Sequence, residues 1–169
     1  EADEMLSGGF LDNIHQMFSC FNPDIQVAIF SATLPTEVLD LTNKFMRNPV
    51  KIIMESEKLN LEGIEQFYLA LNDDNEKYDT LKKLFDFLTV NQSIIYVNSV
   101  QRVEDLYNAM VADGYSVVSI HSSMKREERE KSFKDFRTGT YRVLISSNVT
   151  SRGIDIQQVS IVINFDIPR

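Results

Sequence analysis

The sequence predicts an α/β fold in which parallel sheets carry helices on both faces. Short apolar runs rich in Val, Ile, Phe and Tyr alternate with amphipathic stretches of helical periodicity along most of the 169 residues. Strands that alternate with helices pair in parallel, because each helix carries the chain back to the end of the sheet where the next strand starts. The hydrophobic content of 43% is sufficient for a sizeable core.

In the first third of the chain the pattern predicts too few elements for a complete domain. The elements expected there are helices at 10–21 and 35–47 and strands at 25–31 and 50–54. Pro35 stands in the first turn of the second helix, where a missing N–H is tolerated. Two strands do not form a stable sheet by themselves. Residues 1–54 are therefore predicted to be the C-terminal part of an incomplete first domain.

A second, nearly complete domain is expected at 64–169. The segment before it, 55–63, is charged and polar and ends in Gly63, which is typical of a linker. Gly114 and Gly139 stand where two of the helices are expected to end. The expected elements are strands at 64–71, 92–98, 115–120, 141–147 and 159–166 and helices at 76–89, 100–113 and 124–138.

Composition and charge exclude some classes of protein and leave others open. A net charge of −8 disfavours nucleic-acid binding, but residues 125–169 carry nine basic and six acidic side chains. No apolar run is long enough to cross a bilayer, and the acidic start of the sequence lacks the order of a signal peptide. The single cysteine, Cys20, is expected to be a small buried residue in a protein of a reducing compartment.

Polar clusters follow the predicted strands. In a parallel sheet the carboxyl ends of the strands lie along one edge, where ligands bind. The clusters are SAT at 31–33, NS at 98–99, HSS at 121–123 and SSNVTSRGID at 146–155. The pattern therefore predicts ligand-binding edges in both domains.

Each cluster also has a purely structural interpretation, which is weakest for the last. Residues 31–33 and 98–99 suit a turn or a helix cap, and His121 suits a packed histidine. The segment 125–130, KREERE, suits the solvated face of a helix with internal ion pairs. The SRGID segment at 151–155 is harder to explain without a ligand. Gly153, between an arginine and an aspartate, has no side chain and so allows the backbone or the neighbouring charges to approach a ligand closely.

Taken in order, these motifs resemble those of the DEAD-box RNA helicases over the whole chain. The matching segments are EAD at 1–3, SAT at 31–33, IIYVNS at 94–99, REER at 126–129 and SRGID at 151–155. Further segments, FMRNPV, LNLEGIEQFYLAL, EKYDTL and DIQQVSIVINFDIP, are similar to translation initiation factor 4A and its nuclear paralogue. The resemblance implies RecA-like sheets: part of domain 1, a linker and a nearly complete domain 2.

The resemblance also implies roles for individual residues. Glu1 would orient or deprotonate the attacking water, and Asp3 would bond to Ser31, Ala32 and Thr33 to couple nucleotide state to domain closure. The RNA-binding residues would be Asn98, Ser99, Arg129 and Ser147. The residues near ATP would be Gly153 and Asp155, with Arg152 holding the motif together.

Several family features are changed or lacking in the sequence. Ser122, Ser123, Arg126 and Asn148 stand where the family or subgroup has other residues. The sequence contains no Gly-x-x-x-x-Gly-Lys-Thr phosphate loop, no first aspartate of the box to hold Mg²⁺, and no downstream arginine finger. The chain by itself is therefore expected not to hydrolyse ATP, to retain no certain metal ligand, and to be the central segment of a longer enzyme.

The function expected of that enzyme is ATP-dependent RNA helicase activity with ATP and Mg²⁺ as cofactors, in translation initiation or mRNA processing. Single-stranded or weakly paired RNA, bound without sequence preference, is the expected partner, together with an initiation-factor scaffold protein. Neither a membrane nor DNA is expected as a partner, and the location would be cytoplasmic or nuclear. The alternative is a non-catalytic RNA- or scaffold-binding module derived from the same fold; a third, generic alternative is another parallel α/β nucleotide-binding protein.

Overall fold

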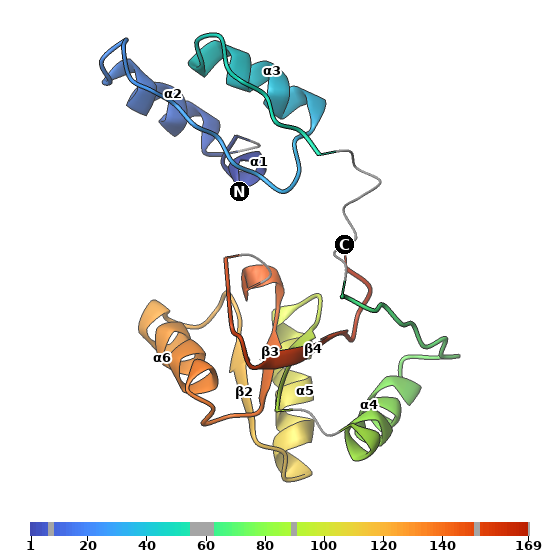
Figure 1. Ribbon diagram of the computed structural model, residues 1–169. Helices are drawn as coiled ribbons and strands as arrows, with labels where there is room; N and C mark the ends of the chain where they lie inside the picture. The colour runs from blue at the N-terminus through green and yellow to red at the C-terminus, as the bar shows by residue number, and fades with distance from the viewer. Residues whose placement is uncertain (7–8, 55–62, 89–90, 151–152, 169) are drawn as a thin grey trace. The chain divides into compact units, whose positions relative to one another are not determined.

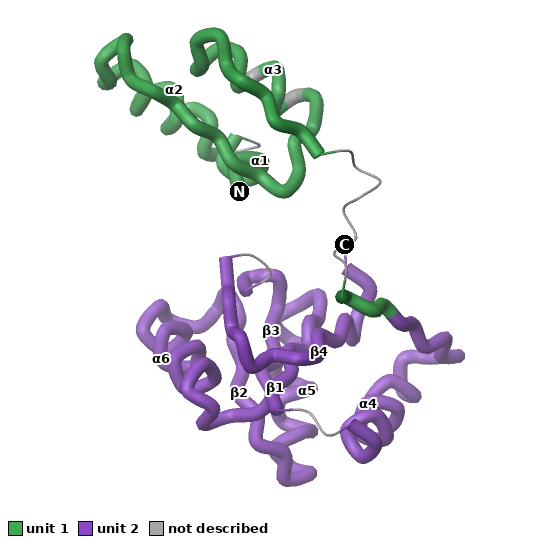
Figure 2. Tube along the Cα trace, in the orientation of Figure 1, with its two compact units in different colours: residues 1–66 green, residues 67–169 purple. Residues whose placement is uncertain are grey.

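The computed structural model describes residues 1–6, 9–54, 63–88, 91–150 and 153–168. The chain divides into two compact units, residues 1–66 and residues 67–169 (Figure 2). The predicted linker at 55–63 lies outside the described residues except for Gly63. The domain boundaries expected from the sequence therefore stay predictions.

Unit 1 is built on three helices, α1 (Ala2–Leu6), α2 (Leu11–Ser19) and α3 (Thr36–Phe45) (Figure 1). Helices α2 and α3 lie within the predicted ranges, and Pro35 directly precedes α3. One buried residue from each helix, Leu6, Ile14 and Val38, forms the centre of the core. The short α1 was not expected, because five residues are too few to show a helical period.

The prediction of strands at 25–31 and 50–54 was wrong: the described structure has no strand in either segment. Both segments run without hydrogen-bonded strand partners, and Phe30, Val50 and Ile52 are 80%, 89% and 88% exposed. An apolar run becomes a strand only when a neighbouring strand satisfies its backbone groups. No described residue of unit 1 provides that neighbour.

Unit 2 contains a four-stranded parallel sheet with the strand order β2-β3-β1-β4. The strands are β1 (Gln92–Tyr96), β2 (Val117–Ile120), β3 (Val143–Ser146) and β4 (Val159–Asn164). The helices are α4 (Glu76–Phe87), α5 (Val100–Ala112) and α6 (Arg126–Arg137), and a 3₁₀ turn at Asn148–Thr150 follows β3. All of these strands and α-helices begin and end within about two residues of the predicted ranges.

Helices cover both faces of this sheet, as predicted (Figure 1). Successive side chains of a strand point to opposite faces, so Ile95 packs with residues of α4 and α5, whereas Ile94 packs with Phe136 of α6. Both faces of the central strands are therefore buried, and Ile95 and Leu144 are fully inaccessible to solvent. This two-sided burial explains why these strands are continuous apolar runs in the sequence.

Two further expectations fail in the described residues. The segment at 64–71 forms no strand, and Phe67 and Tyr68 are 85% and 91% exposed, so the sheet has four strands where five were expected. Cys20 is exposed at the C-cap of α2, so the expectation of a buried cysteine was wrong. Within the described ranges, no helix is long and apolar enough to cross a membrane.

Candidate functional site

In unit 1, the carboxylate of Asp3 is held by two hydroxyl groups from the segment 31–33. The Ser31 hydroxyl donates to Asp3 Oδ1 at 2.7 Å, and the Thr33 hydroxyl donates to Asp3 Oδ2 at 2.8 Å. Ser31 Oγ also accepts from the Asp3 N–H at 3.3 Å. The contact implied for Asp3 is thus present, and these hydroxyls serve the carboxylate rather than capping α3. Ala32, between them, is exposed.

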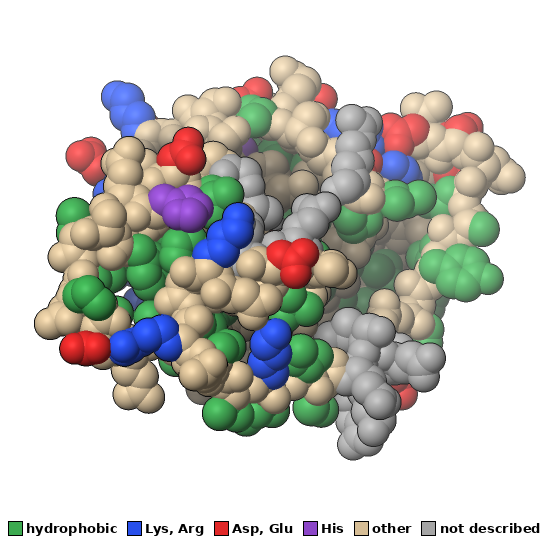
Figure 3. All heavy atoms as spheres, turned by 90° about the horizontal axis from the view of Figure 1, so that it is seen from above, with side chains coloured by type: hydrophobic (Ala, Val, Ile, Leu, Met, Phe, Trp, Pro, Cys, Tyr) green, Lys and Arg blue, Asp and Glu red, His purple; other side chains and the backbone are tan. Residues whose placement is uncertain are grey.

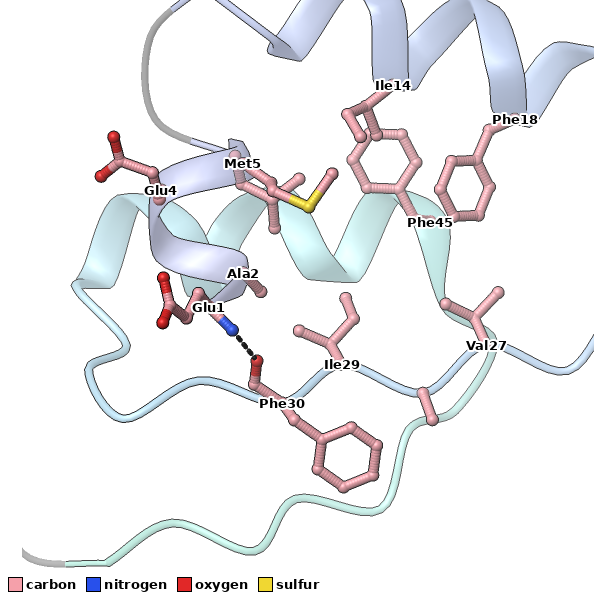
Figure 4. Close-up of a pocket in the computed structure, with 12 residues that line it drawn as sticks. Glu1, Ala2, Glu4, Met5, Ile14, Phe18, Val27, Ile29, Phe30 and Phe45 are labelled. Atoms are coloured by element: carbon pink, nitrogen blue, oxygen red, sulfur yellow. Dashed lines mark hydrogen bonds between the residues drawn. The ribbon is translucent and has the colours of Figure 1, made fainter. Parts of the chain in front are cut away.

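Glu1 lies at the rim of an open groove of about 510 Å³ (Figure 4). The walls of the groove are mainly apolar and include Ile14, Phe18, Ile29 and Phe45. Figure 4 shows the Glu1 carboxylate turned away from these side chains, while the Glu1 nitrogen donates to the Phe30 carbonyl oxygen at 3.0 Å. The carboxylate therefore belongs to the solvated surface, where a general base could reach water.

In unit 2, the predicted ligand-binding residues lie at the carboxyl ends of β1, β2 and β3. Tyr96, Ile120 and Ser146 end these strands, and the register pairs Tyr96 with Ser146 and Ser146 with Ile120. The residues that follow, at 98–99, 121–123 and 147–150, consequently start from the same edge of the sheet. This alignment brings together predicted RNA-binding residues that are about fifty positions apart in the sequence.

Asn98 and Ser99 form the turn between β1 and α5. Ser99 caps the helix, since its hydroxyl oxygen accepts from the Arg102 N–H at 3.3 Å. The Asn98 side-chain amide donates to the Ile167 carbonyl oxygen at 2.7 Å, and the Asn98 N–H donates to Asp166 Oδ2 at 3.0 Å. The cap expected as the structural interpretation is therefore present, and the RNA-binding role of this turn stays a prediction.

Asp166 is the centre of an ion-pair network that the sequence analysis did not single out. It is only 8% exposed and lies 2.9 Å from Lys77 Nζ and 2.7 Å from Arg102 Nε. Asp74 contacts the same two cations, at 2.7 Å from Lys77 Nζ and 2.8 Å from a terminal nitrogen of Arg102. Asp166 also binds the Asn98 N–H, so the network ties α4, α5 and the end of β4 to the predicted RNA-binding turn.

The network shifts the pKa values of its members in the directions expected for ion pairs. Burial by itself raises the pKa of Asp166, but the Asn98 N–H, Lys77 and Arg102 outweigh it, and the pKa lies below its usual value. Hydrogen bonds from Arg102 and Lys77 hold the pKa of Asp74 far below its usual range. The Asp74 carboxylate is in turn the main cause that raises the pKa of Lys77 and of Arg102.

A simple sequence signal could have found only part of this network. Asp166 ends the predicted strand 159–166, so the rule that polar residues at strand ends mark the ligand edge applies to it as well. Lys77 and Arg102 lie on helices whose polar faces look ordinary in the sequence. Lys77 and Asp166 are 89 positions apart, and no local pattern links them.

Ser147 lies directly after β3 and is 9% exposed. Its N–H donates to the Ile120 carbonyl oxygen at 3.3 Å, and its carbonyl oxygen accepts from Ser146 Oγ at 2.8 Å. The Ser147 hydroxyl takes no part in these bonds. The backbone of Ser147 is consequently fixed while its side-chain oxygen remains available to a ligand.

His121 and the start of α6 fit the structural interpretations given above. His121 is 9% exposed, its Nε2 lies 3.9 Å from Glu104 Oε1, and its Nδ1 is buried without a hydrogen bond. Arg126 pairs with Glu130 across one helical turn at 2.7 Å, and this pairing raises the pKa of Arg126. Arg129 is partly exposed on the same helix. On the face drawn in Figure 3, Lys and Arg side chains (blue) are interspersed with Asp and Glu side chains (red).

The nucleotide-facing residues predicted in SRGID are only partly described. Gly153 has a φ of +71°, a conformation that side chains other than glycine rarely adopt, and Asp155 is exposed. Arg152 lies outside the described residues. Among the described residues, no group of three His, Cys, Asp or Glu side chains could hold a metal ion.

Comparison with known proteins identifies the second unit. Residues 76–169 match the helicase conserved C-terminal domain. The ATP-dependent RNA helicase eIF4A of Candida glabrata is 47% identical over 168 residues, which is 99% of this chain and 42% of that protein. Eukaryotic initiation factor 4A of Caenorhabditis elegans is 45% identical over the same share of both chains. This chain therefore spans less than half the length of these relatives.

Solved structures give the same result for the fold. The structure of S. cerevisiae Dbp5 bound to RNA and ADP BeF3 superimposes with a TM-score of 0.90 at 33% identity, covering 99% of this chain and 43% of the Dbp5 chain. A structure of the C-terminal domain of the DEAD-box protein Dbp5 covers 64% of this chain at 37% identity, with a TM-score of 0.59. The expected α/β fold, a RecA-like parallel sheet with helices on both faces, is thereby confirmed for unit 2.

Proposed function

The chain belongs to the DEAD-box RNA helicases, and we propose that it supplies the coupling segment and the RNA-binding edge of an ATP-dependent RNA helicase. In this proposal RNA is clamped and locally unwound, and ATP hydrolysis serves its release. The kinship with initiation factor 4A, at 45–47% identity, favours a role in translation initiation or mRNA processing. A scaffold protein of that process is a candidate partner.

The observation that carries the proposal is the double hydrogen bond between Asp3 and the hydroxyls of Ser31 and Thr33. Asp3 belongs to the segment whose first residue, Glu1, would orient the attacking water. A movement of this carboxylate on hydrolysis would reach residues 31–33 through two bonds of 2.7 and 2.8 Å. Bonds from hydroxyls to a charged acceptor are short and directional, so they suit such a link.

The RNA-binding part of the proposal rests on the shared edge of the sheet. Asn98, Ser99 and Ser147 start from that edge with short polar groups, and Arg129 provides a partly exposed cation on α6. Groups of this kind bind phosphates and sugars rather than base edges, which predicts binding without sequence preference. A similar protein, Dbp5, has been solved with RNA and ADP BeF3 bound, which favours the same two ligand classes here.

The nucleotide would be held partly by this chain and partly by residues of the kind that the family carries in its phosphate loop. Asp155 is exposed next to a left-handed Gly153, and a carboxylate of this type can accept a bond from the ATP ribose. Mg²⁺ would neutralise charge on the phosphates when bound. Within this chain, Glu1 would position water near them.

The decisive experiment is RNA-stimulated ATP turnover and duplex separation by the full-length protein, compared with the double variant Ser31→Ala, Thr33→Val. The variant should keep most of its ATP turnover and lose duplex separation at least tenfold, because the link from Asp3 is broken while Glu1 is unchanged. Ser19→Ala, which removes an exposed hydroxyl bonded only to the Gln16 carbonyl oxygen, is the matched control and should change neither. The chain by itself should show no ATP turnover.

Absence of turnover at saturating RNA would refute the helicase proposal. If the full-length protein then still bound RNA, the alternative of a non-catalytic module would replace it. Loss of turnover and unwinding to the same degree in the double variant would show that residues 31–33 do not act as a coupling segment.

A further inference from the structure

A buried chain of hydroxyl groups lies under the loop that follows β3. The Tyr96 hydroxyl donates to the Thr150 carbonyl oxygen at 2.9 Å, and Thr150 Oγ1 donates to Ser146 Oγ at 2.7 Å. Ser146 Oγ lies 3.1 Å from the Ile120 carbonyl oxygen and 2.8 Å from that of Ser147. Ser146 is fully buried and Thr150 is 6% exposed. Hydrogen bonds from these hydroxyls therefore join the ends of β1, β2 and β3, with Ser146 and Thr150 buried and Tyr96 half-buried.

The bonds in this chain have a fixed direction. A hydroxyl carries one proton, so Ser146, which accepts from Thr150, directs its own proton at the carbonyl oxygens of Ile120 and Ser147. Without the Thr150 hydroxyl, Ser146 would lose its donor and could rotate. A buried oxygen that loses the donor it accepts from is costly, so the turn at 147–150 would shift to restore that bond. The Thr150 hydroxyl consequently controls the position of the Ser147 backbone.

The other end of the loop is held by a different force. Ile154 and Ile156, on either side of Asp155, pack against the apolar cluster that contains Ile94 and Phe136. Apolar contacts of this kind do not depend on the hydroxyl of Thr150. Breaking the hydroxyl chain should therefore disturb the Ser147 end of the loop and leave the Asp155 end in place.

We propose that Thr150 and Tyr96 are positioning residues for RNA: they hold Ser147 so that its free hydroxyl meets a phosphate or sugar of the strand. The inference rests on the proposed function, because it assigns to Ser147 the RNA contact given above. The inference adds that the two ends of one loop are fixed independently. Hydrogen bonds from hydroxyls fix the Ser147 end, which would contact RNA, and apolar packing fixes the Asp155 end, which would contact the nucleotide.

The test uses ATP turnover of the full-length protein, measured separately against RNA and against ATP concentration. Thr150→Val keeps the shape of the side chain and removes its hydroxyl. It should raise the RNA concentration for half-maximal turnover roughly tenfold, a difference typical of one good hydrogen bond, and leave the half-saturating ATP concentration within about twofold. Thr150→Ser retains the hydroxyl and should restore wild-type RNA dependence. Tyr96→Phe should produce a smaller change of the same kind.

Two controls separate positioning from general destabilisation. Thr140→Val removes an exposed hydroxyl, and Tyr141→Phe removes the hydroxyl of another tyrosine packed on the cluster that contacts Tyr96. Both should behave as wild type. An unchanged half-saturating RNA concentration in Thr150→Val would overturn the inference. So would an equal rise of the half-saturating RNA and ATP concentrations, or a Thr150→Ser variant that behaves like Thr150→Val. A wild-type protein without RNA-stimulated turnover would instead overturn the proposed function.

Discussion

Single residues distinguish this chain from its family pattern, and two of them stand at the predicted RNA-binding edge. Asn148 lies in the 3₁₀ turn after β3, where the resemblance to the initiation-factor subgroup implies an aspartate, and Ser122 follows β2, where the resemblance to the family implies a glycine. Both residues are exposed. An amide cannot form the ion pair that a carboxylate forms, and a side chain at 122 keeps an approaching phosphate further from the backbone.

We therefore expect Ser122→Gly to tighten RNA binding by the full-length protein and Asn148→Asp to change it, each by roughly two- to fivefold, the range of one partly solvated ion pair or contact. Fluorescence anisotropy with a labelled single strand at fixed salt measures the change. Asn91→Asp adds the same charge before β1, at the opposite end of the strand, and should have no effect. Equal RNA affinity in all four proteins would rule out a functional consequence of these departures.

At the scale of elements, the Asp166 network joins helices to the sheet. Lys77 of α4 and Arg102 of α5 both contact a carboxylate that lies just beyond β4. Because Asp166 is almost completely buried, its removal takes away the buried carboxylate that Lys77 and Arg102 share and leaves them the more exposed Asp74, whereas loss of an exposed pair changes little. The network therefore contributes to how α4, α5 and the sheet stay together.

Asp166→Asn should lower the free energy of unfolding of unit 2 by about 3 kcal/mol at pH 7. The pKa of Asp166 is lowered by folding, so its contribution is complete above the ordinary value of 3.8 and is lost as the pH falls through the lower folded value. The difference between wild type and variant should consequently shrink below about pH 4. Urea unfolding followed by circular dichroism from pH 7 to pH 2.5 measures it.

Glu130→Gln serves as the control, because it breaks an exposed pair on α6 whose side chains are 63% and 85% exposed. Its effect on the free energy of unfolding should be negligible at every pH, because solvent screens an exposed pair. A difference for Asp166→Asn that stays constant down to pH 2.5 would contradict a pKa of Asp166 that is lower in the folded than in the unfolded protein.

At the scale of the whole molecule, the two units differ in how much apolar surface they bury. Among the described residues, three are buried in the core of unit 1, while unit 2 has clusters of nine and five buried residues. Unit 1 also carries unpaired apolar segments at 25–31 and 50–54. Since burial of apolar surface is the main stabilising term, unit 1 has less to offset its conformational entropy.

Hydrogen exchange of this chain should therefore show low protection in residues 1–54 and strong protection in β1 and β3 of unit 2. Strand β3 is the best internal control, because all four of its residues are buried and it pairs on both sides. Protection in 25–31 equal to that in β3 would show that this segment is hydrogen-bonded in solution. The two units would then differ less in stability than their buried apolar residues indicate.

The sequence by itself determined the alternation of elements in unit 2, the polar residues at the strand ends, and the family. These follow from local patterns, because side-chain periodicity and turn residues act over a few positions. Only the tertiary structure decided which polar residues meet: Asp166 with Lys77, Thr150 with Ser146, and the burial of Ser147. It also decided that the apolar runs at 25–31, 50–54 and 64–71 stay unpaired among the described residues, because a strand depends on a neighbour distant in sequence that no local pattern specifies.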